Sequence, residues 1–294
     1  MAQHDDRIWL LCGDLGYSVL ERFASQFPER FVNMGVAEQN MTGVAAGLAL
    51  SGKTVVTYSI ANFPVMRCLE QIRNDVCYHA ANVKIVAVGG GMAYGTAGYT
   101  HHGIEDLAVM RALPGMTVIA PGDPVETRLA TQAVIQTPGP CYLRLGKGGE
   151  PTVHAQPPTF QIGKAITVRE GTDAILITTG SVLPEVTKAA DVLVAQGVSA
   201  GVLSMPSIQP IDSAAILSAA RHARLLFTVE EHAQFGGLGS AVAEVLSASD
   251  VPHGPMLHAY VRGKLSTVGS LAYLRQVSGL DAQTLVETVT AALA

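Results

Sequence analysis

Glu38 is the residue of this 294-residue chain whose type and setting point most directly to chemistry. It lies in the segment RFVNMGVAEQNMTG, where a short apolar run gives way to a stretch of small residues typical of a helix. Burial among apolar groups favours the protonated form of a carboxyl, which could then donate a proton at neutral pH. A first-turn glutamate that only complements a helix dipole fits the same pattern, so the pattern alone leaves both roles open.

Two later loops carry further groups of this kind. His101 and His102 stand near the end of the loop GTAGYTHHG, and Lys147 lies in LRLGKGG, close to Arg144. An imidazole can move protons near neutral pH, and a cationic side chain can hold an anionic substrate. For the two histidines, the competing interpretation is a surface or packing role.

The segments GDLGYS and YSIANFP add four candidates, which are Asp14, Ser18, Ile60 and Phe63. Asp14 could face a ligand or cap its own loop. Phe63 could stack on a planar ring, an arrangement worth about 0.5–1.5 kcal/mol beyond buried area, or it could pack in the core.

These candidates lie in or beside loops of a chain in which strand-like runs alternate with helical stretches. The pattern predicts strands at 8–13, 30–35, 54–59, 83–91, 116–122 and 141–146, and helices at 37–50, 65–78, 104–112 and 124–136. Such alternation indicates a parallel sheet covered on both faces. Ligands of these sheets bind beyond the carboxyl ends of the strands, which selects the loops 13–18, 35–39, 58–63, 89–102 and 145–149.

The stretch EPTVHAQPPTF, at 150–160, has three prolines and no periodic pattern, and it is the best linker candidate. Beyond it, strands are predicted at 174–180, 198–205, 225–230 and 258–263, and helices at 184–196, 213–221, 240–247 and 281–293. The sequence therefore predicts an α/β fold of two consecutive domains, each a mostly parallel sheet flanked by helices. Their expected bounds are 1–150 and 164–294, joined by a linker at 151–163.

The composition argues against several classes of protein. The chain is 48% hydrophobic and 15% charged, enough to bury a substantial core, and its net charge of −5 comes without a basic run. We therefore expect neither nucleic acid nor a membrane surface as a partner. The four cysteines form no metal-like cluster, and we find neither a signal peptide nor an apolar run of about 20 residues. We therefore expect free thiols, a cytoplasmic location and no metal ligands in this chain.

Three longer segments resemble one known family. SIANFPVMRCLEQIRNDV and MAYGTAGYTHHGIEDLAVMRALPGMTVIAPGD resemble the pyrimidine-binding domain of the transketolase family of thiamine-diphosphate enzymes. VEEHAQFGGLGSAVAEVL resembles the C-terminal domain of the same family. The resemblance is strongest to split transketolases, in which this C-terminal half is a separate chain. It covers nearly the whole sequence, and the order and spacing of the segments carry it.

The resemblance implies cofactor binding by Asp14, Glu38, Ile60 and Phe63. In the family, the carboxyl at the Glu38 position hydrogen-bonds a ring nitrogen of the aminopyrimidine of thiamine diphosphate and favours the tautomer that activates the cofactor. Glu38 is therefore also a catalytic candidate. Phe63 falls where the family places an aromatic residue against that ring, and Ile60 where many relatives carry a second one. Asp14 aligns with a cofactor-side aspartate.

Substrate binding is implied for Ser18, His101, Lys147 and Arg144. Ser18 falls where transketolases place a hydroxyl near the substrate phosphate. His101 matches a family histidine that contacts substrate oxygens and can move protons, so it is the second catalytic candidate. Lys147 replaces an arginine that binds the sugar phosphate, which keeps the charge but loses the bidentate fork, and Arg144 is a nearby substitute.

Two positions depart from the pattern of the family. Many relatives have the form G-E-D-G before the histidine, and the aspartate contacts a hydroxyl of the ketose donor, which Ala97 cannot do. Gly89, in a run of three glycines, replaces a phosphate-side histidine. We therefore expect a deoxy, amino, sulfonated or otherwise modified sugar, or a 2-oxo acid, as donor rather than the standard pentose phosphates. The sequence names neither the donor and acceptor nor the partner chain.

The G-D-G motif that holds a divalent metal and the diphosphate in the family has no counterpart in this sequence. Mg²⁺ or Ca²⁺ is therefore expected mainly on a partner, an N-terminal transketolase-like subunit, in an α2β2 assembly. The implied function is transfer of a two-carbon ketol unit from a ketose to an aldose, at a site formed between the chains.

Two alternatives stay open. The β subunit of a 2-oxo acid dehydrogenase, or an acyl-transferring synthase of the same superfamily, shares the glutamate, the aromatic residue and the two-domain layout. The segments LEQIRNDV and AVMRALPGMTVI favour split transketolases. The other alternative is a non-catalytic assembly subunit. Glu38, Phe63 and His101 argue against it, whereas Ala97 and the three glycines leave room for it.

Overall fold

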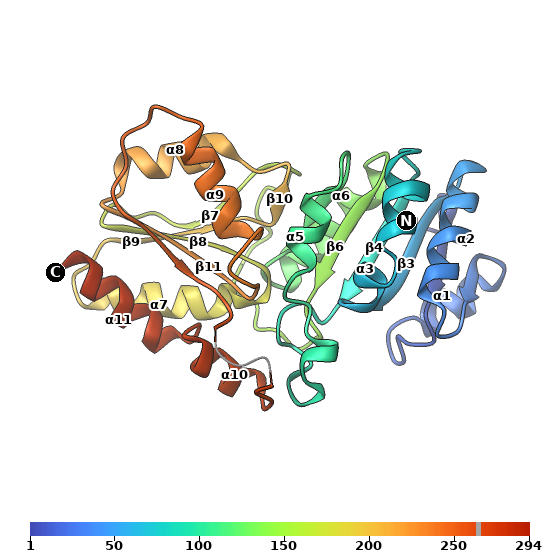
Figure 1. Cartoon of the computed structure of the whole chain (residues 1–294), viewed down its shortest axis with the longest axis horizontal. Helices are drawn as coiled ribbons and strands as arrows, with labels where there is room; N and C mark the ends of the chain where they lie inside the picture. Colours follow the sequence, from blue (N-terminus) through green and yellow to red (C-terminus); the bar gives the residue numbers. More distant parts are fainter. Residues whose placement is uncertain (263–265) are drawn as a thin grey trace.

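The computed structural model describes residues 1–262 and 266–294 of the chain. Two sheets lie next to each other along the long axis of the molecule, each flanked by helices (Figure 1). This confirms the predicted α/β fold of two consecutive domains with mostly parallel sheets. The domain bounds 1–150, 151–163 and 164–294 stay a prediction. Among the described residues, no helix is long and apolar enough to cross a membrane.

The first sheet comes almost entirely from the N-terminal half of the chain. Its parallel strands are β1 (Ile8–Cys12), β2 (Phe31–Asn33), β3 (Thr54–Ile60), β4 (Val83–Val88), β5 (Thr117–Ile119) and β6 (Cys141–Leu145). A further strand, β10 (Ser207–Gln209), comes from the second half and pairs antiparallel with β5. Within the described residues the order is β10–β5–β6–β4–β3–β1–β2. The sequence pattern did not predict β10.

Helices cover both faces of the first sheet. They include α1 (Glu21–Gln26), the short turn η1 (Pro28–Arg30), α2 (Glu38–Leu50), α5 (Asp106–Arg111) and α6 (Pro124–Gln136). Leu11 belongs to the apolar cluster shared with α2 and α5, whereas its neighbour Leu10 belongs to the cluster shared with α6 and with Phe23 of α1. This alternation is what a parallel sheet buried on both faces requires.

The segment predicted as one helix, 65–78, is interrupted. The chain forms α3 (Phe63–Met66), α4 (Leu69–Gln71) and a π-helical turn, η2 (Ile72–Cys77). At the break, the carbonyl of Arg67 accepts a hydrogen bond from Gln39 Nε2 at 2.9 Å. Side chains that bond to helical carbonyls disturb the regular backbone ladder. Because Gln39 belongs to α2, this contact is a tertiary one that periodicity does not register.

The second sheet follows from the C-terminal half. Its strands are β7 (Ile166–Arg169), β8 (Ala174–Thr179), β9 (Ala200–Ser204), β11 (Leu225–Glu230) and β12 (Met256–Ala259). The order is β12–β11–β8–β9–β7 within the described residues, with β7 alone antiparallel to its neighbour there. The strand predicted at 258–263 therefore begins and ends earlier than expected, and its Gly263 lies outside the described residues.

The helices of the second domain pack in two groups. They are η5 (Gly180–Val182), α7 (Leu183–Ala195), α8 (Ser213–His222), α9 (Leu238–Ser247), α10 (Leu271–Ser278) and α11 (Ala282–Leu293). Residues of α7, α10 and α11 share one apolar cluster, and residues of α8 and α9 share another. The pattern missed α1, α10, β7 and β10, each of which has eight residues or fewer.

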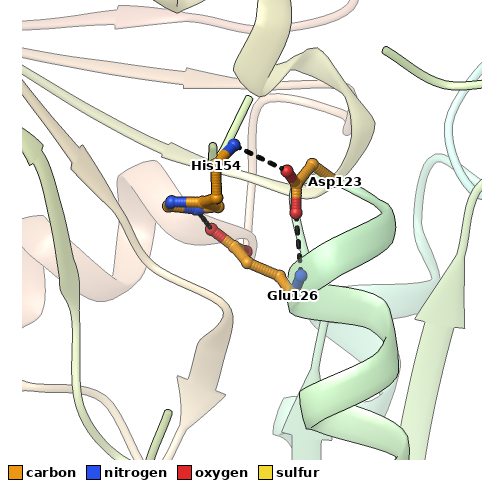
Figure 2. A group of neighbouring side chains, drawn as sticks. All are labelled: Asp123, Glu126 and His154. Carbon is orange, nitrogen blue, oxygen red and sulfur yellow. Dashed lines mark hydrogen bonds and ion pairs between the residues drawn. The ribbon is translucent and has the colours of Figure 1, made fainter. Parts of the chain in front are cut away.

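The segment between the two sheets is tied to the first domain by Asp123, Glu126 and His154 (Figure 2). Asp123 caps α6, because Oδ1 accepts from the Glu126 N–H at 2.8 Å, and Oδ2 accepts from the N–H groups of Val153 and His154 at 2.9 and 3.0 Å. Glu126 Oε1 lies 2.8 Å from His154 Nε2, and Oε2 accepts from the Gly122 N–H at 2.7 Å. These polar groups therefore satisfy one another and fix the path of the chain as it leaves the first sheet.

Candidate active site

Glu38 is the first residue of α2, and its carboxyl is buried where the chain passes from β2 into that helix. Gly35 lies in the connecting turn with φ +68°, a conformation that favours glycine. Glu38 is 3% exposed. Its Oε2 accepts a hydrogen bond from Arg67 Nη1 at 3.0 Å, and the two groups form an ion pair with a half-exposed arginine. One turn on, the Thr42 hydroxyl donates to the Glu38 carbonyl at 2.9 Å.

The space beside Glu38 is bordered by a glycine and an unpaired hydroxyl. A Cβ at Gly13, directly after β1, would lie 3.8 Å from Glu38 Oε1 and 3.6 Å from Ser59 Oγ. Ser59 Oγ is buried and has no hydrogen-bond partner among the described residues. The bond from Arg67 uses Oε2 and leaves Oε1 for another partner. Buried polar atoms rarely stay unpaired, so this arrangement fits a polar ligand.

Phe63, the first residue of α3, packs on His101 and is linked to Glu38 through Arg67. The Cζ atom of Arg67 lies 4.4 Å from the centroid of the Phe63 ring, so the arginine that pairs with Glu38 also covers this ring. The rings of His101 and Phe63 meet edge to face, with centroids 5.2 Å apart. Ile60 is half-buried at the end of β3. Glu38, Phe63 and His101, which come from three separate segments, therefore form one group, which we call the site triad.

His101 is held by a short loop after β4. It ends the turn η4 (Tyr99–His101), which follows the turn η3 (Gly95–Ala97). Its Nδ1 lies 2.9 Å from Thr100 Oγ1. The Thr100 carbonyl in turn accepts from Asn62 Nδ2 at 3.1 Å, which ties the loop to the residue directly before Phe63. The imidazole is thus held by Thr100, and through Thr100 by Asn62 on the segment that carries Phe63.

His102 and Ala97, in the same loop, have different surroundings. His102 is buried, its Nε2 lies 3.2 Å from the Gly95 carbonyl, and desolvation lowers the pKa of its imidazole. It therefore packs inside the loop and holds the turn. Ala97 ends η3 and is exposed, and its methyl group offers no hydrogen bond.

Tyr94 belongs to this site, although the sequence did not single it out. Gly89 follows β4 with φ +79°, and a Cβ there would lie 2.1 Å from Tyr94 Cε2. The Tyr94 and His101 ring centroids are 6.0 Å apart, and Lys147 Nζ lies 5.0 Å from the Tyr94 centroid. Tyr94 therefore joins two predicted substrate residues and fills the space that a side chain at position 89 would need. The sequence feature that could have pointed to Tyr94 was Gly89, because a glycine in place of a larger residue leaves room for the side chain of a neighbouring residue.

Arg144 has surroundings unlike those expected of a substrate ligand. It is 4% exposed. Its Nε donates to Asp106 Oδ2 at 2.9 Å, and its Nη2 donates to the carbonyls of Gly103 and Glu231 at 2.5 and 2.8 Å. Tyr142 also donates its hydroxyl to Asp106 Oδ2, at 2.5 Å. The hydrogen bonds of the guanidinium thus link the first sheet to the loop after β4 and to the second domain. For this reason we do not propose Arg144 as a substrate ligand.

Asp14 and Ser18 lie between β1 and α1, both exposed and both with positive φ, 58° and 64°. Asp14 Oδ1 accepts from Asn33 Nδ2 at 3.0 Å, and the Asp14 N–H donates to Asn33 Oδ1 at 3.1 Å. The Ser18 N–H donates to Glu21 Oε1 at 2.7 Å. Among the described residues these hydrogen bonds do not reach the site triad, so the roles of both residues stay predictions.

Comparison with known families covers both halves of the chain. The description "Transketolase, pyrimidine binding domain" matches residues 1–150, and "Transketolase, C-terminal domain" matches residues 163–285. The chain belongs to the transketolase family. This confirms the resemblance inferred from the sequence, and with it a transferase of the transketolase type that depends on thiamine diphosphate.

Relatives of this transketolase chain include subunits of split enzymes. One of the subunits of an apulose-4-phosphate transketolase from Phocaeicola vulgatus is 42% identical over 254 residues, which are 86% of this chain and 81% of the relative. A 6-deoxy-6-sulfo-D-fructose transketolase subunit from Clostridium sp. is 38% identical over 286 residues, 97% of this chain and 88% of the relative. A solved chain of a split-gene transketolase, an inactive β4 tetramer, is 40% identical with a TM-score of 0.88, covering 99% of this chain and 93% of that one.

These comparisons confirm a transketolase-like C-terminal subunit and do not favour the 2-oxo acid dehydrogenase or assembly-subunit alternatives. Acyl-transferring synthases are also related. A 1-deoxy-D-xylulose-5-phosphate synthase from Thermomicrobium roseum is 36% identical over the whole of this chain and 47% of its own length. The likeness to split transketolase subunits extends over most of both sequences, whereas the likeness to this synthase stops at about half of the synthase.

Proposed function

We propose that this chain works as the C-terminal subunit of a two-chain transketolase and transfers a two-carbon ketol unit from a ketose to an aldose. The observation that carries the proposal is the site triad: an aromatic ring packs on an imidazole and is linked through Arg67 to a buried carboxyl, beside the loops that follow β3 and β4. Ligands of parallel sheets bind at this edge.

The residues of the site triad fit the pyrimidine end of thiamine diphosphate. When bound, the cofactor supplies the electron sink that carbon–carbon bond cleavage and formation require. Glu38 would hold a proton at a ring nitrogen through Oε1, the oxygen left free by Arg67. Phe63 would pack against the ring. His101 would exchange protons with substrate oxygens. Its ring contacts both Phe63 and Tyr94, and Tyr94 in turn contacts Lys147, the residue expected to bind the anionic end of the substrate.

A partner chain is part of the proposal. Transketolase from Leishmania mexicana has the same fold, with a TM-score of 0.79 at 22% identity, and this chain covers 43% of its length. The diphosphate site and the Mg²⁺ or Ca²⁺ ion would be carried by an N-terminal subunit. We propose two copies of each chain, α2β2, with the active site between them.

The donor that we propose is a modified sugar rather than a standard pentose phosphate. Ala97 presents a methyl group, and the space at Gly89 is taken by the Tyr94 ring, so two polar contacts of the family pattern are replaced. Lys147 keeps a cation near the site. The substrates named for two relatives carry a phosphate and a sulfo group, which agrees with an anionic donor.

The test is a donor screen with the assembled enzyme. This chain is co-expressed with a diphosphate-domain partner, supplied with thiamine diphosphate and Mg²⁺, and offered xylulose 5-phosphate, branched, deoxy and sulfonated ketoses, and 2-oxo acids. The expected result is a stable complex that transfers a ketol unit from a modified ketose best. Failure to form a complex with any such partner would contradict the proposed partner. A clear preference for xylulose 5-phosphate would contradict the proposed donor.

A further inference from the structure

Tyr94 occupies a place in the site that depends on a second residue. Gly89 has a positive φ, and both Cε2 and Cδ2 of Tyr94 lie within 2.4 Å of where its Cβ would be, at 2.1 and 2.4 Å. Any larger residue at position 89 would displace the ring. The wall of the site at this point is therefore an aromatic ring supplied from the following loop.

The ring of Tyr94 contacts two parts of the candidate site. One is His101, with ring centroids 6.0 Å apart, and His101 in turn packs on Phe63 at 5.2 Å. The other is the ammonium group of Lys147, 5.0 Å from the Tyr94 centroid. A substrate that reaches from the reacting centre to a cation at Lys147 would pass along Tyr94.

The hydroxyl of Tyr94 is available to such a substrate. Tyr94 is half-buried, and among the described residues its hydroxyl forms no hydrogen bond. Desolvation raises the pKa of the phenol, so the group is neutral and keeps its proton at physiological pH. The residue therefore offers a rigid apolar face and one hydrogen-bond donor.

We propose that Tyr94 is a specificity-determining residue of the donor site, whose ring packs on the carbon chain of the ketose and whose hydroxyl donates to one donor oxygen. The inference rests on the proposed function. It assigns a substrate class: ketoses with an anionic end that binds Lys147 and with C–H groups, rather than a row of hydroxyls, facing the Tyr94 ring. An aromatic face attracts C–H surface and leaves additional hydroxyls without partners.

The test compares Tyr94→Phe, Tyr94→Leu and a matched control, Tyr99→Phe, in the complete complex with its partner chain, thiamine diphosphate and Mg²⁺. Tyr99 is in the same loop, is 44% exposed, and donates its hydroxyl to Glu105 Oε1 at 2.8 Å. The readouts are kcat and KM for two anionic ketoses that differ by one hydroxyl, KM for the acceptor aldehyde, cofactor affinity by fluorescence titration, and the thermal midpoint.

Tyr94→Phe should raise KM for the preferred donor by about fivefold, the effect of one neutral hydrogen bond, with cofactor affinity unchanged. Tyr94→Leu should lower kcat/KM for that donor by about tenfold or more and narrow the preference between the two donors. Tyr99→Phe should leave the preference unchanged.

A Tyr94 that only fills space would give a different result. Tyr94→Phe would then behave as wild type, and Tyr94→Leu would lower the thermal midpoint and reduce activity on both donors equally. Either outcome overturns this inference and leaves the proposed function standing. A wild-type complex that transfers no ketol unit from any ketose would overturn the proposed function, and the donor site with it.

Discussion

Glu38 and Arg67 form an ion pair in which Oε2 lies 3.0 Å from Nη1, and the same guanidinium covers the ring of Phe63. The carboxyl is 3% exposed, whereas the arginine side chain is half-exposed. A protonated Glu38 that donates to a cofactor has no charge for Arg67 to balance. Proton donation to a cofactor through Oε1 would therefore weaken the ion pair that Arg67 makes at Oε2.

Glu38→Gln should lower ketol transfer by at least about 100-fold in the assembled complex, because the amide cannot hold and release the proton that the carboxyl carries. The fold should persist, since the side chains are nearly isosteric. Initial rates and circular dichroism measure the two effects. Glu70→Gln, an exposed glutamate on α4, is the control and should be neutral. Near-normal turnover of the Glu38 variant would remove it from catalysis.

Arg67→Met should lower the free energy of unfolding of the isolated chain by about 1–3 kcal/mol at pH 7, because the buried Glu38 carboxylate loses its hydrogen-bonded partner. Urea unfolding measures the change. The same substitution in a Glu38→Gln background should cost less, since no charge is left unbalanced. Equal costs in both backgrounds would show that the pair does not couple.

Arg144→Met and Lys147→Met should have opposite profiles. Removing Arg144 leaves the buried Asp106 without its cation and should cost about 3–5 kcal/mol of stability. Removing Lys147 should change stability by less than about 0.5 kcal/mol. It should raise KM for an anionic donor by roughly tenfold, because a charge-assisted contact is lost. Chemical unfolding and donor titrations with the assembled enzyme separate the two. A stable Arg144 variant with a raised donor KM would reverse the assignment.

The His154–Glu126 pair should make stability depend on pH. The hydrogen bond to Glu126 raises the pKa of His154 above its usual value of 6.5. A raised folded pKa means that the stabilisation is complete below about pH 6.5 and is lost as the pH rises through the folded value. His154→Gln should therefore destabilise most at low pH, and its difference from wild type in urea unfolding should shrink as the pH rises through the folded pKa of His154. A difference that is constant with pH would exclude a protonated His154.

Gly89→Ala should cost about 2–5 kcal/mol, from a strained positive φ and from contact with the Tyr94 ring. In a Tyr94→Leu background the cost should fall to about 1–2 kcal/mol, because only the backbone strain remains. Thermal and urea unfolding of wild type, the two single variants and the double variant give the coupling energy. Additive costs would mean that the ring and position 89 do not share space.

Many helices and strands were predictable because short stretches of sequence determine them. Helix 124–136 and strand 225–230 match the structure at both ends, since each has a continuous local pattern and clear flanking signals. The interrupted segment 65–78 was not predictable in this way, because the hydrogen bond from Gln39 to Arg67 joins residues that are 28 positions apart. Strand β10 was missed for the same reason, since its partner β5 precedes it by nearly ninety residues.

The sequence alone determined that Glu38, Phe63 and His101 follow strand-like runs, and the rule that ligands bind at one edge of a parallel sheet predicted that they would meet. Only the tertiary structure decided what surrounds them. Arg144 and Lys147 are both cationic and three residues apart. Arg144 is nevertheless buried, at 4% exposed, and pairs with Asp106, whereas Lys147 lies over the Tyr94 ring. Side-chain burial depends on packing between distant segments, and a local pattern carries no information about which segments will meet.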